Sequence, residues 1–455
     1  MLNTIVLQQK KDIQLQKSLL PLEKIQALLR KSDRDFMKAM LSTSNGYIFE
    51  CKLASPSSGK LREDYPVTKL AKQYANYANA LSVLTNERFF AGNFNHLKEV
   101  SKVVQVPLLC KDIIIDQYQI ALARLNGANA ILLMLSVLDD KMYLALKDYA
   151  LSLNMTVLTE VFSEQELIRA NQLHAHVIVV NHRDLNTMQV DMMRLNKLAP
   201  YLDKKAYIIA ASGIQNYQDI KQLKPYAQGF LIGSSLSKSP ALNHTLKDLR
   251  FGPIKICGLT RQEDVNLAST LGATYGGLIF VPSSLRKVTF MQAKKIVQGK
   301  LKFVGVFANQ PPEEVANIAK GLKLFAVQLH GQEDAEYINA LYQKLGQSSQ
   351  IWQAIDGNLP LLQTLPPFVD KLIVDNKGGG TGQTFAWDKL NNSPLKNNMI
   401  LAGGISSENI LKAKSYGMYG MDINSGVELA PGIKDAQKLT KLFQLLKQGA
   451  FHENT

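Results

Sequence analysis

The sequence has few cysteines and no long apolar run, and both absences restrict the class of protein. Three cysteines in 455 residues do not make a disulfide framework, so a reducing compartment is expected. The longest apolar run, residues 130–138, is about half of the roughly 20 residues that a membrane-spanning helix needs. The first residues lack an apolar signal region followed by a small-residue cleavage site. We therefore expect a cytoplasmic protein with no membrane partner.

Dense basic runs and metal-ligand spacings are also missing. The net charge is +14, but its lysines are spread along both halves without interleaved aromatic residues. Such a charge can equally attract an anionic metabolite, so nucleic acid is not expected as a partner. A basic nucleic-acid or scaffold protein is the rival class, and steeply salt-dependent retention on DNA would favour it. The seven histidines show no metal-ligand spacing with cysteines or carboxylates, which predicts no metal site.

Short β-rich runs alternate with helical stretches throughout the chain. Eight runs begin at residues 47, 80, 107, 130, 156, 177, 207 and 229, and eight more at residues 254, 275, 303, 325, 350, 371, 399 and 419. Alternating strands and helices imply parallel pairing, and eight such units close into a barrel. We predict an α/β fold with two tandem (β/α)8 TIM barrels, at residues 1–252 and 253–455. Residues 1–46 are expected to form a helical extension packed on the first barrel.

One glycine-framed segment occurs twice. Residues 212–235 and 403–426 align without a gap, and each is predicted to contain strand 7, helix 7 and strand 8 of a barrel. In this fold the loops after strands 7 and 8 often bind phosphate. The alternative is that the glycines merely end strands. Because the segment occurs twice in one register, we expect two phosphate pockets. They would bind two phosphorylated substrates, or one intermediate that passes between the two sites. The aligned pairs include Gly213 with Gly404, Gly229 with Gly420, and Ser234 with Ser425.

Charged and polar residues follow the strands of the first predicted barrel, where this fold carries its catalytic groups. Two lysines and two carboxylates converging on a barrel mouth suit proton transfers around a carbonyl. For any one of them alone, an ion pair at the rim is an equally good interpretation. The residues are Glu50 and Lys52 on one side of strand 1, Lys111 at the end of strand 3, Glu160 at the end of strand 5, and Asn181 and Arg183 after strand 6.

The second predicted barrel places a thiol opposite a carboxyl group. Cys257 ends its first strand and Asp375 ends its sixth. Such a pair suits base and acid catalysis at a phosphate-binding mouth. An inert buried cysteine is the alternative, because cysteine is among the most buried residue types.

The first half resembles indole-3-glycerol phosphate synthase. The motifs ECKLASPSSG, LLCKDII, LTEV, NHRDL and ASGI followed by FLIGSSL occur in order over about residues 1–250. The resemblance implies decarboxylating ring closure of carboxyphenylamino-deoxyribulose phosphate to indole-3-glycerol phosphate. It implies that Lys111 is the general acid on the substrate carbonyl, that Glu160 and Lys52 share later proton transfers, and that Glu50 supports an iminium charge. The implied substrate contacts are Ser55, Phe90, Asn181, Arg183 and Ser212, and the implied phosphate contacts are Gly213, Gly233 and Ser234.

Two positions depart from that family's pattern. Ala211 stands where the family usually has a glutamate that would face the site, and Ile113 replaces a phenylalanine of the indole pocket. Losing a preorganised carboxylate beside developing positive charge could cost a few kcal/mol of barrier. We expect an active but slower site. The alternative is that only the second barrel is active.

The second half resembles phosphoribosylanthranilate isomerase. KICGLTRQEDV, FVPSSLRKV, VQLHG, DNKGGGTGQTF, LAGGI and DINSGVE with PGIKD carry the likeness from about residue 254 onward. It implies an Amadori rearrangement of N-(5-phosphoribosyl)anthranilate without metal or organic cofactor, in which Asp375 protonates the ribose ring oxygen and Cys257 removes the C2′ proton. Arg286 would hold the anthranilate carboxylate and His330 would line the pocket. The implied phosphate contacts are Gly380, Gly382, Gly404, Ser425 and Gly426.

The two likenesses fit one another. The product implied for the second barrel is the substrate implied for the first, which explains why both would hold the same phosphorylated chain. The family's usual proline before Arg286 is Leu285 here, which frees the backbone at that point. A two-barrel chain needs no partner to complete either site, so we expect a monomer acting on small phosphorylated, anthranilate-derived substrates.

Overall fold

The computed structural model describes residues 2–52, 54–55, 59–60, 66–185, 187–376 and 384–449. Backbone contacts divide the chain into two compact units, Met1–Leu246 and Lys247–Ala450. Helix α13 (Leu242–Phe251) ends just before strand β11 (Ile254–Ile256), where the sequence predicted the junction. We propose that the domain boundary lies between residues 252 and 253, just after the end of this helix.

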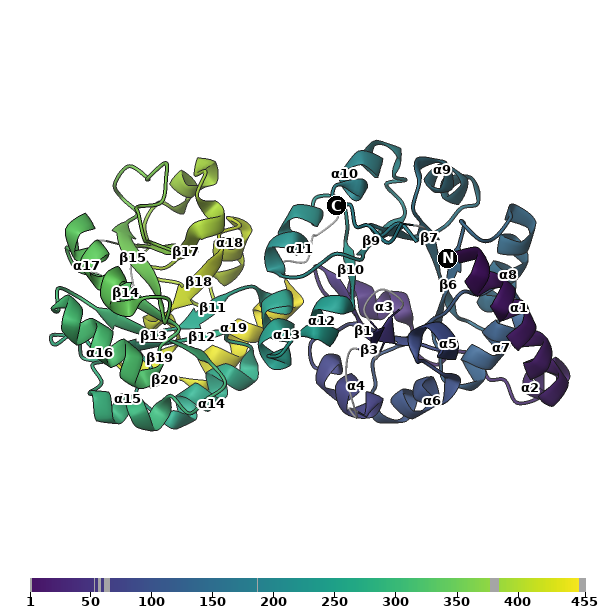
Figure 1. Cartoon of the computed structure of the whole chain (residues 1–455), viewed down its shortest axis with the longest axis horizontal. Coiled ribbons are helices and arrows are strands. Elements are labelled where there is room, and N and C mark those ends of the chain that lie inside the picture. Colours follow the sequence, from purple (N-terminus) through teal and green to yellow (C-terminus); the bar gives the residue numbers. More distant parts are fainter. Residues whose placement is uncertain are drawn as a thin grey trace. The chain divides into compact units, whose positions relative to one another are not determined.

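The first unit contains a closed barrel of eight parallel strands (Figure 1), which confirms the prediction. Each strand pairs with its neighbours in chain order, and the last pairs with the first through Gly46 and Gly229. The strands are β1 (Gly46–Cys51), β4 (Ala80–Leu84), β5 (Leu108–Lys111), β6 (Ala130–Met134), β7 (Thr156–Val161), β8 (Val177–Asn181), β9 (Tyr207–Ala211) and β10 (Gly229–Ile232). A short antiparallel pair, β2 (Ala54–Ser55) and β3 (Gly59–Lys60), follows β1 and was not predicted.

The second unit contains another closed eight-stranded parallel barrel, also as predicted. Its strands are β11, β12 (Tyr275–Ile279), β13 (Lys302–Phe307), β14 (Ala326–Leu329), β15 (Gln350–Asp356), β16 (Lys371–Asp375), β17 (Met399–Leu401) and β18 (Gly420–Ile423). A hairpin of β19 (Glu428–Ala430) and β20 (Ile433–Lys434) follows the last barrel strand. This hairpin was not predicted, and its Glu428 carboxylate binds Arg286, which lines the second mouth.

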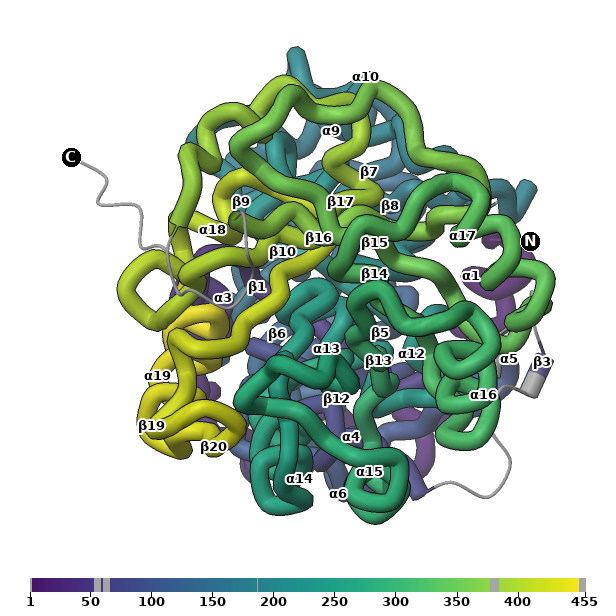
Figure 2. The backbone as a smooth tube through the Cα atoms, turned by 90° about the vertical axis from the view of Figure 1, so that its left-hand side faces the viewer, coloured from purple at the N-terminus to yellow at the C-terminus, as the bar shows by residue number. Residues whose placement is uncertain are grey.

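Helices surround the strands of each barrel (Figures 1 and 2). Most begin at a side-chain cap; the Asn216 side chain, for example, accepts hydrogen bonds from the first turn of α11. None of the described helices is long and apolar enough to cross a membrane. In the first unit they are α1 (Leu2–Leu19), α2 (Leu22–Gln26), α3 (Phe36–Leu41), α4 (Val67–Ala75), α5 (Glu87–Phe90), α6 (Phe94–Val103), α7 (Gln117–Leu125), α8 (Asp140–Ser152), α9 (Glu164–Gln172), α10 (Arg194–Leu198), α11 (Tyr217–Leu223) and α12 (Ser234–Lys238). The second unit has α14 (Gln262–Leu271), α15 (Phe290–Ile296), α16 (Pro312–Leu322), α17 (Ala335–Leu345), α18 (Ile410–Ser415) and α19 (Ala436–Gln448).

One connection, after β15, departs from the alternation of strand and helix. Residues 357–370 are all described and contain turns and bends but no helix. Pro360, Pro366 and Pro367 explain this, since proline lacks an N–H donor and restricts the residue before it. The connection after β16 contains two 3-10 segments, η2 (Trp387–Asn392) and η3 (Lys396–Asn398), among its described residues.

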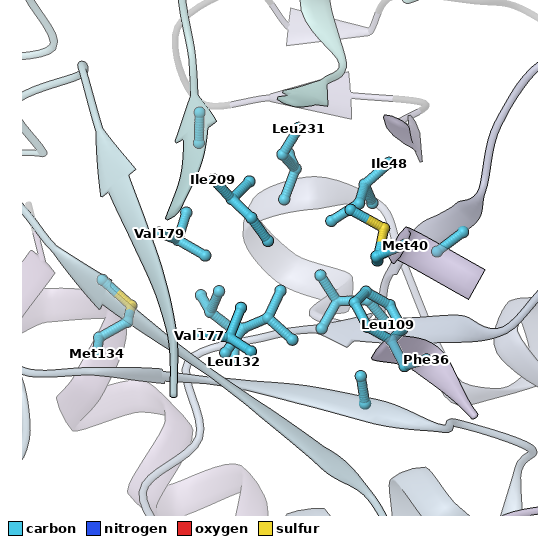
Figure 3. Packing of buried hydrophobic residues seen from close by; sticks show 14 of the residues in the cluster. Phe36, Met40, Ile48, Leu109, Leu132, Met134, Val177, Val179, Ile209 and Leu231 are labelled. Atoms are coloured by element: carbon cyan, nitrogen blue, oxygen red, sulfur yellow. The ribbon is translucent and has the colours of Figure 1, made fainter. Parts of the chain in front are cut away.

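The N-terminal extension closes the floor of the first barrel, as its predicted packing requires. Phe36 and Met40 of α3 belong to the same buried cluster as inward-facing strand residues, and Figure 3 shows them beside Ile48 and Leu109. A Cβ on Gly46 would meet the ends of the Met40 and Tyr207 side chains, so glycine at this position lets both side chains pack against the strand. The floor is therefore filled with apolar side chains, and polar groups gather at the opposite, C-terminal ends of the strands.

Candidate active sites

The repeated segment forms the same turn in both barrels. Ser212 and Gly213, after β9, have φ values of 69° and 83°, and Gly403 and Gly404, after β17, have φ values of 81° and 64°. Two successive left-handed residues therefore stand at aligned positions in each copy. This conformation costs glycine little and brings bare backbone close to a ligand. Each turn lines a cavity at its barrel mouth.

The first mouth is a cavity of about 1040 Å³. Leu2 and Ile5 of α1 form part of its wall, so the N-terminal extension reaches the site. All but one of the site residues predicted for this barrel line this single cavity; for the remaining one, Ser55, only the backbone is described, and the side-chain prediction lies outside the described residues. The lining residues include Glu50, Lys52, Phe90, Lys111, Glu160, Asn181, Arg183, Ser212, Gly213, Gly233 and Ser234.

Two lysine–carboxylate pairs stand in this mouth. The Lys52 Nζ lies 3.5 Å from the Glu50 Oε1, and the Lys111 Nζ lies 3.6 Å from the Glu160 Oε2. The Asn181 Nδ2 donates to the Glu160 Oε1 at 3.2 Å, which fixes that carboxylate. Burial lowers the pKa of Lys111, but the negative charges of Glu160 and Glu50 outweigh burial and raise it. Lys111 is therefore held as an ammonium donor.

The two departures from the synthase pattern both line this cavity. Ala211 pairs in register with Asn181, and Ile113 follows the Lys111 strand. Met188, Val190 and Met192 form an apolar stretch of the same wall. The mouth thus keeps the lysines and carboxylates of the two pairs, and both departures from the pattern place aliphatic side chains in its wall.

Gly233 has a packing role that the sequence did not reveal. A Cβ at this position would lie 2.5 Å from the Glu50 Oε1 and 3.1 Å from the Glu50 Cδ. Its missing side chain therefore leaves room for the Glu50 carboxylate. Arg183 also has an internal contact, because its Nη1 donates to the Met188 carbonyl at 2.9 Å.

The second mouth is a cavity of about 420 Å³. Cys257, Arg286, His330 and Asp375 line it, together with the left-handed turn at Gly404. The His330 Nε2 lies 3.7 Å from the Asp375 Oδ2, and the Gln328 Nε2 lies 3.1 Å from the His330 Nδ1. Burial raises the pKa of Asp375, and His330 only partly opposes this effect. A carboxyl group with a raised pKa is suited to donate a proton near neutral pH.

Arg286 is held by a carboxylate that sequence reasoning missed. Its Nε lies 3.0 Å from both Glu428 carboxylate oxygens, and its Nη2 lies 2.8 Å from the Glu428 Oε2. The buried Lys434 Nζ donates to the same carboxylate at 2.9 Å. Burial raises the pKa of Glu428, but its bonds to Arg286 and Lys434 outweigh burial and lower it. These contacts engage Nε and Nη2 of the guanidinium, so Nη1 is oriented by a fixed fork.

A neighbouring cavity of about 660 Å³ shares Gly404 and Ser425 with the second mouth. Gly426 also lines it, and a Cβ there would lie 2.1 Å from the Ile405 carbonyl oxygen. Three of the five predicted phosphate contacts therefore lie together, at the repeated turn and the start of η4 (Ser425–Val427). The other two, Gly380 and Gly382, lie outside the described residues.

The structure also places a buried lysine beside the predicted thiol. The Lys255 Nζ lies 3.2 Å from the Cys257 Sγ and 2.6 Å from the Asp422 Oδ2. The spacing of Lys255 and Cys257 on one strand could have indicated this contact, since residues two apart point to the same side. Asp422 could not be paired with them from spacing, because it lies on the last barrel strand. In the described ranges no group of three or more histidine, cysteine or acidic residues is arranged to hold a metal ion.

Comparison with known proteins places these two mouths in families. The model of indole-3-glycerol phosphate synthase matches residues 2–249, and that of N-(5′-phosphoribosyl)anthranilate (PRA) isomerase matches residues 254–445. The tryptophan biosynthesis protein TrpCF of Salmonella typhi is 45% identical, with 94% of each chain covered. The TrpCF protein of Buchnera aphidicola from Schizaphis graminum is 44% identical, with 98% of each chain covered.

The chain belongs to the bifunctional TrpCF family. It is an enzyme of tryptophan biosynthesis with two barrels. The first is the synthase, which is a decarboxylating lyase, and the second is the isomerase. The comparisons support this interpretation and not the alternative in which only the isomerase barrel is active. The rival interpretation as a basic nucleic-acid or scaffold protein is not supported either.

Proposed function

We propose that each mouth catalyses its family's reaction with the residues that line it. One observation carries the proposal: in each barrel, acid and base groups line the same cavity as the left-handed turn of the repeated segment. A turn that binds phosphate would place one end of the substrate. The reacting atoms would then lie among the acid and base groups.

In the isomerase barrel, Asp375 protonates the ribose ring oxygen and opens the ring to a Schiff base. Its raised pKa supports this role, because the carboxyl group keeps its proton to higher pH. Cys257 then removes the C2′ proton, and the enolamine tautomerises to the ketone. The Arg286 Nη1 binds the anthranilate carboxylate, while Glu428 holds the guanidinium in place. His330 acts beside Asp375.

In the synthase barrel, the Lys111 ammonium group donates a proton to the substrate carbonyl as the ring closes. Glu160 and Lys52 share the later proton transfers, and Glu50 stabilises the iminium charge. The 3.6 Å separation of Lys111 and Glu160 supports proton exchange between them after small movements. Loss of carbon dioxide, followed by departure of the protonated carbonyl oxygen as water, then leaves the indole product.

Backbone and small side chains hold the two ends of the synthase substrate. The phosphate contacts are Gly213, Gly233 and Ser234, and in the isomerase they are Gly380, Gly382, Gly404, Ser425 and Gly426. Ser55, Phe90, Asn181, Arg183 and Ser212 orient the anthranilate end in the synthase. Because Gly233 also makes room for Glu50, its replacement would disturb both the phosphate and a catalytic carboxylate.

The enzyme would act as a cytoplasmic monomer, without metal, organic cofactor, membrane or nucleic-acid partner. The described residues that line each mouth come from one unit of the chain. Its three cysteines are free and buried, as suits a reducing compartment.

Two variants of the full chain, assayed separately for each half-reaction, test these roles. Lys111→Ala should lower synthase kcat by about 10²–10⁴-fold and leave isomerase kinetics unchanged, because a general acid is lost in one barrel only. Asp375→Asn should do the reverse, by a similar factor. Equal losses in both reactions for either variant, or no loss in the targeted one, would contradict the assignments.

A further inference from the structure

The contact between Lys255, Cys257 and Asp422 is a charged cluster inside the second barrel. Lys255 and Cys257 lie two residues apart on β11, and Lys255 pairs in register with Asp422 on β18. The Lys255 side chain is 1% exposed and that of Asp422 is 7% exposed. An ammonium group this deeply buried is costly unless it is paired, so its position needs an explanation.

The packing around the cluster reserves space for this contact. A Cβ on Gly277 of β12 would lie 2.6 Å from the Cys257 Sγ and 3.0 Å from the Lys255 Cε. A side chain at residue 277 would crowd both the thiol and the lysine. Glycine at this position leaves the space that the two groups occupy.

The ammonium group is shared between an anion and the thiol. Lys255 donates to the Asp422 Oδ2 at 2.6 Å and to the Cys257 Sγ at 3.2 Å. The Asp422 Oδ1 is buried and has no hydrogen-bond partner among the described residues. The Asp422 Oδ2 thus accepts one hydrogen bond from Lys255. The same ammonium group has a further N–H to donate to the Cys257 sulfur.

We propose that Lys255 is a positioning residue for the isomerase reaction: its ammonium group, anchored by Asp422, favours the thiolate form of Cys257. The proposal rests on the role of Cys257 as the base. A thiol buried this deeply is otherwise poorly reactive, because the thiolate is the form that takes up a proton.

The electrostatics of the site agree with the geometry. Burial raises the pKa of the Cys257 thiol, Lys255 opposes that rise, and Asp422 adds to it. Burial lowers the pKa of Lys255, but Asp422 and Cys257 outweigh burial and raise it, so the lysine stays charged. The other charged groups around the thiol lie further along the cavity wall or behind it. The groups that face Cys257 are Lys255 (β11), Asp422 (β18), Asp375 (β16), His330 (after β14), Arg286 (after β12) and Lys434 (β20).

The experiment measures the ionisation of Cys257 without any turnover. Full-length protein is treated with iodoacetamide over a range of pH, and the rate of alkylation of the Cys257 peptide is followed by mass spectrometry. Lys255→Met should raise the thiol pKa by one unit or more, about a tenfold slower alkylation at neutral pH. It should lower isomerase kcat more than it raises KM. Lys247→Met is the matched control, since Lys247 is a buried lysine bonded to Ser269, away from the cavity.

Asp422→Asn gives the opposite prediction. Removing this anion should lower the thiol pKa, because Lys255 is then free to pair with the thiolate. The double variant Lys255→Met/Asp422→Asn removes both buried charges and decides the matter if the single lysine variant fails to fold. Its thiol pKa should lie above that of Asp422→Asn.

Equal thiol pKa values in Asp422→Asn and the double variant would overturn the proposal, as would an unchanged value in folded Lys255→Met. A loss of the base role is a separate result: Cys257→Ser with normal isomerase activity would refute the proposed mechanism. The alkylation profiles would still decide what Lys255 does to the thiol.

Discussion

The two barrels share a turn and differ in the charges around it. Both have two successive left-handed residues after the seventh strand, at aligned positions of the repeated segment. In the first mouth, lysine–carboxylate pairs are separated by 3.5 and 3.6 Å and line an open cavity. In the second, the lysine beside the Cys257 thiol is fully buried, and its 2.6 Å contact is with a carboxylate inside the barrel.

This comparison separates the turn, which is proposed to bind the substrate, from the charged groups that are proposed to react with it. In the proposed reactions both ligands end in phosphate, which the shared turn would bind, whereas the strand ends would carry the groups specific to each reaction. A decarboxylating ring closure calls for a charged acid, and the pKa of Lys111 is raised. A ring opening calls for a neutral acid at the same pH, and the pKa of Asp375 is raised by burial.

Arg286→Lys should have the largest effect of the variants that sharpen this comparison. A lysine cannot keep the forked contact with Glu428 and offer further donors in a fixed plane, so isomerase KM should rise about tenfold or more. Synthase kinetics should not change. Steady-state isomerase assays across substrate concentration measure the effect.

Lys287→Arg is the matched control for that variant, because it makes the opposite exchange at the next residue, which is exposed. Its KM should equal that of the unaltered protein. A fall in kcat with unchanged KM in Arg286→Lys would contradict a carboxylate-binding role for Arg286.

Ala211→Glu tests the smaller contrast between this first mouth and the usual synthase pattern. The new carboxylate would face the cavity beside Asn181 and stabilise developing positive charge, so synthase kcat should rise by about tenfold. Following indole product by its fluorescence gives the rate. Ala211→Gln has the same length without the charge and should give no rise. Equal effects of the two variants would attribute any change to volume alone.

Gly426→Ser places a serine in the second barrel at the position where the first barrel has Ser235. A Cβ at residue 426 meets the Ile405 carbonyl oxygen, a backbone atom that cannot move aside cheaply. We expect a loss of about 1–3 kcal/mol in stability. Trp352 and Trp387 both lie in the second unit, so tryptophan fluorescence during thermal unfolding reports on it. Ser235→Gly should leave that transition in place, and an unchanged midpoint in Gly426→Ser would contradict the close approach.

The fold was largely predictable from the sequence. All sixteen barrel strands were predicted, because β-rich runs between turn residues are a local signal. The helix expected in residues 357–370 is missing because three prolines outweigh the pattern of the surrounding chain. The hairpin of β19 and β20 is only three and two residues long in its strands, too short for a period of two to be recognised.

The candidate sites were predictable where a residue type at a strand end indicates its own chemistry. Lys111 and Asp375 are of this kind, since each is the last residue of a barrel strand. The contacts of Lys255 could not be predicted in this way, because its ion-pair partner Asp422 is 167 positions away. The two residues are neighbours only because the last barrel strand pairs with the first. Glu428 was missed for the same reason, since its partner Arg286 lies 142 positions earlier.

We propose that one chain carries two separate sites that act in sequence. The most direct test supplies N-(5-phosphoribosyl)anthranilate and follows indole-3-glycerol phosphate with Lys111→Ala, with Asp375→Asn, and with an equal mixture of the two. Each variant alone should form little product, and the mixture should restore it, because the isomerase of one chain feeds the synthase of the other. A mixture as inactive as the separate variants would contradict the account.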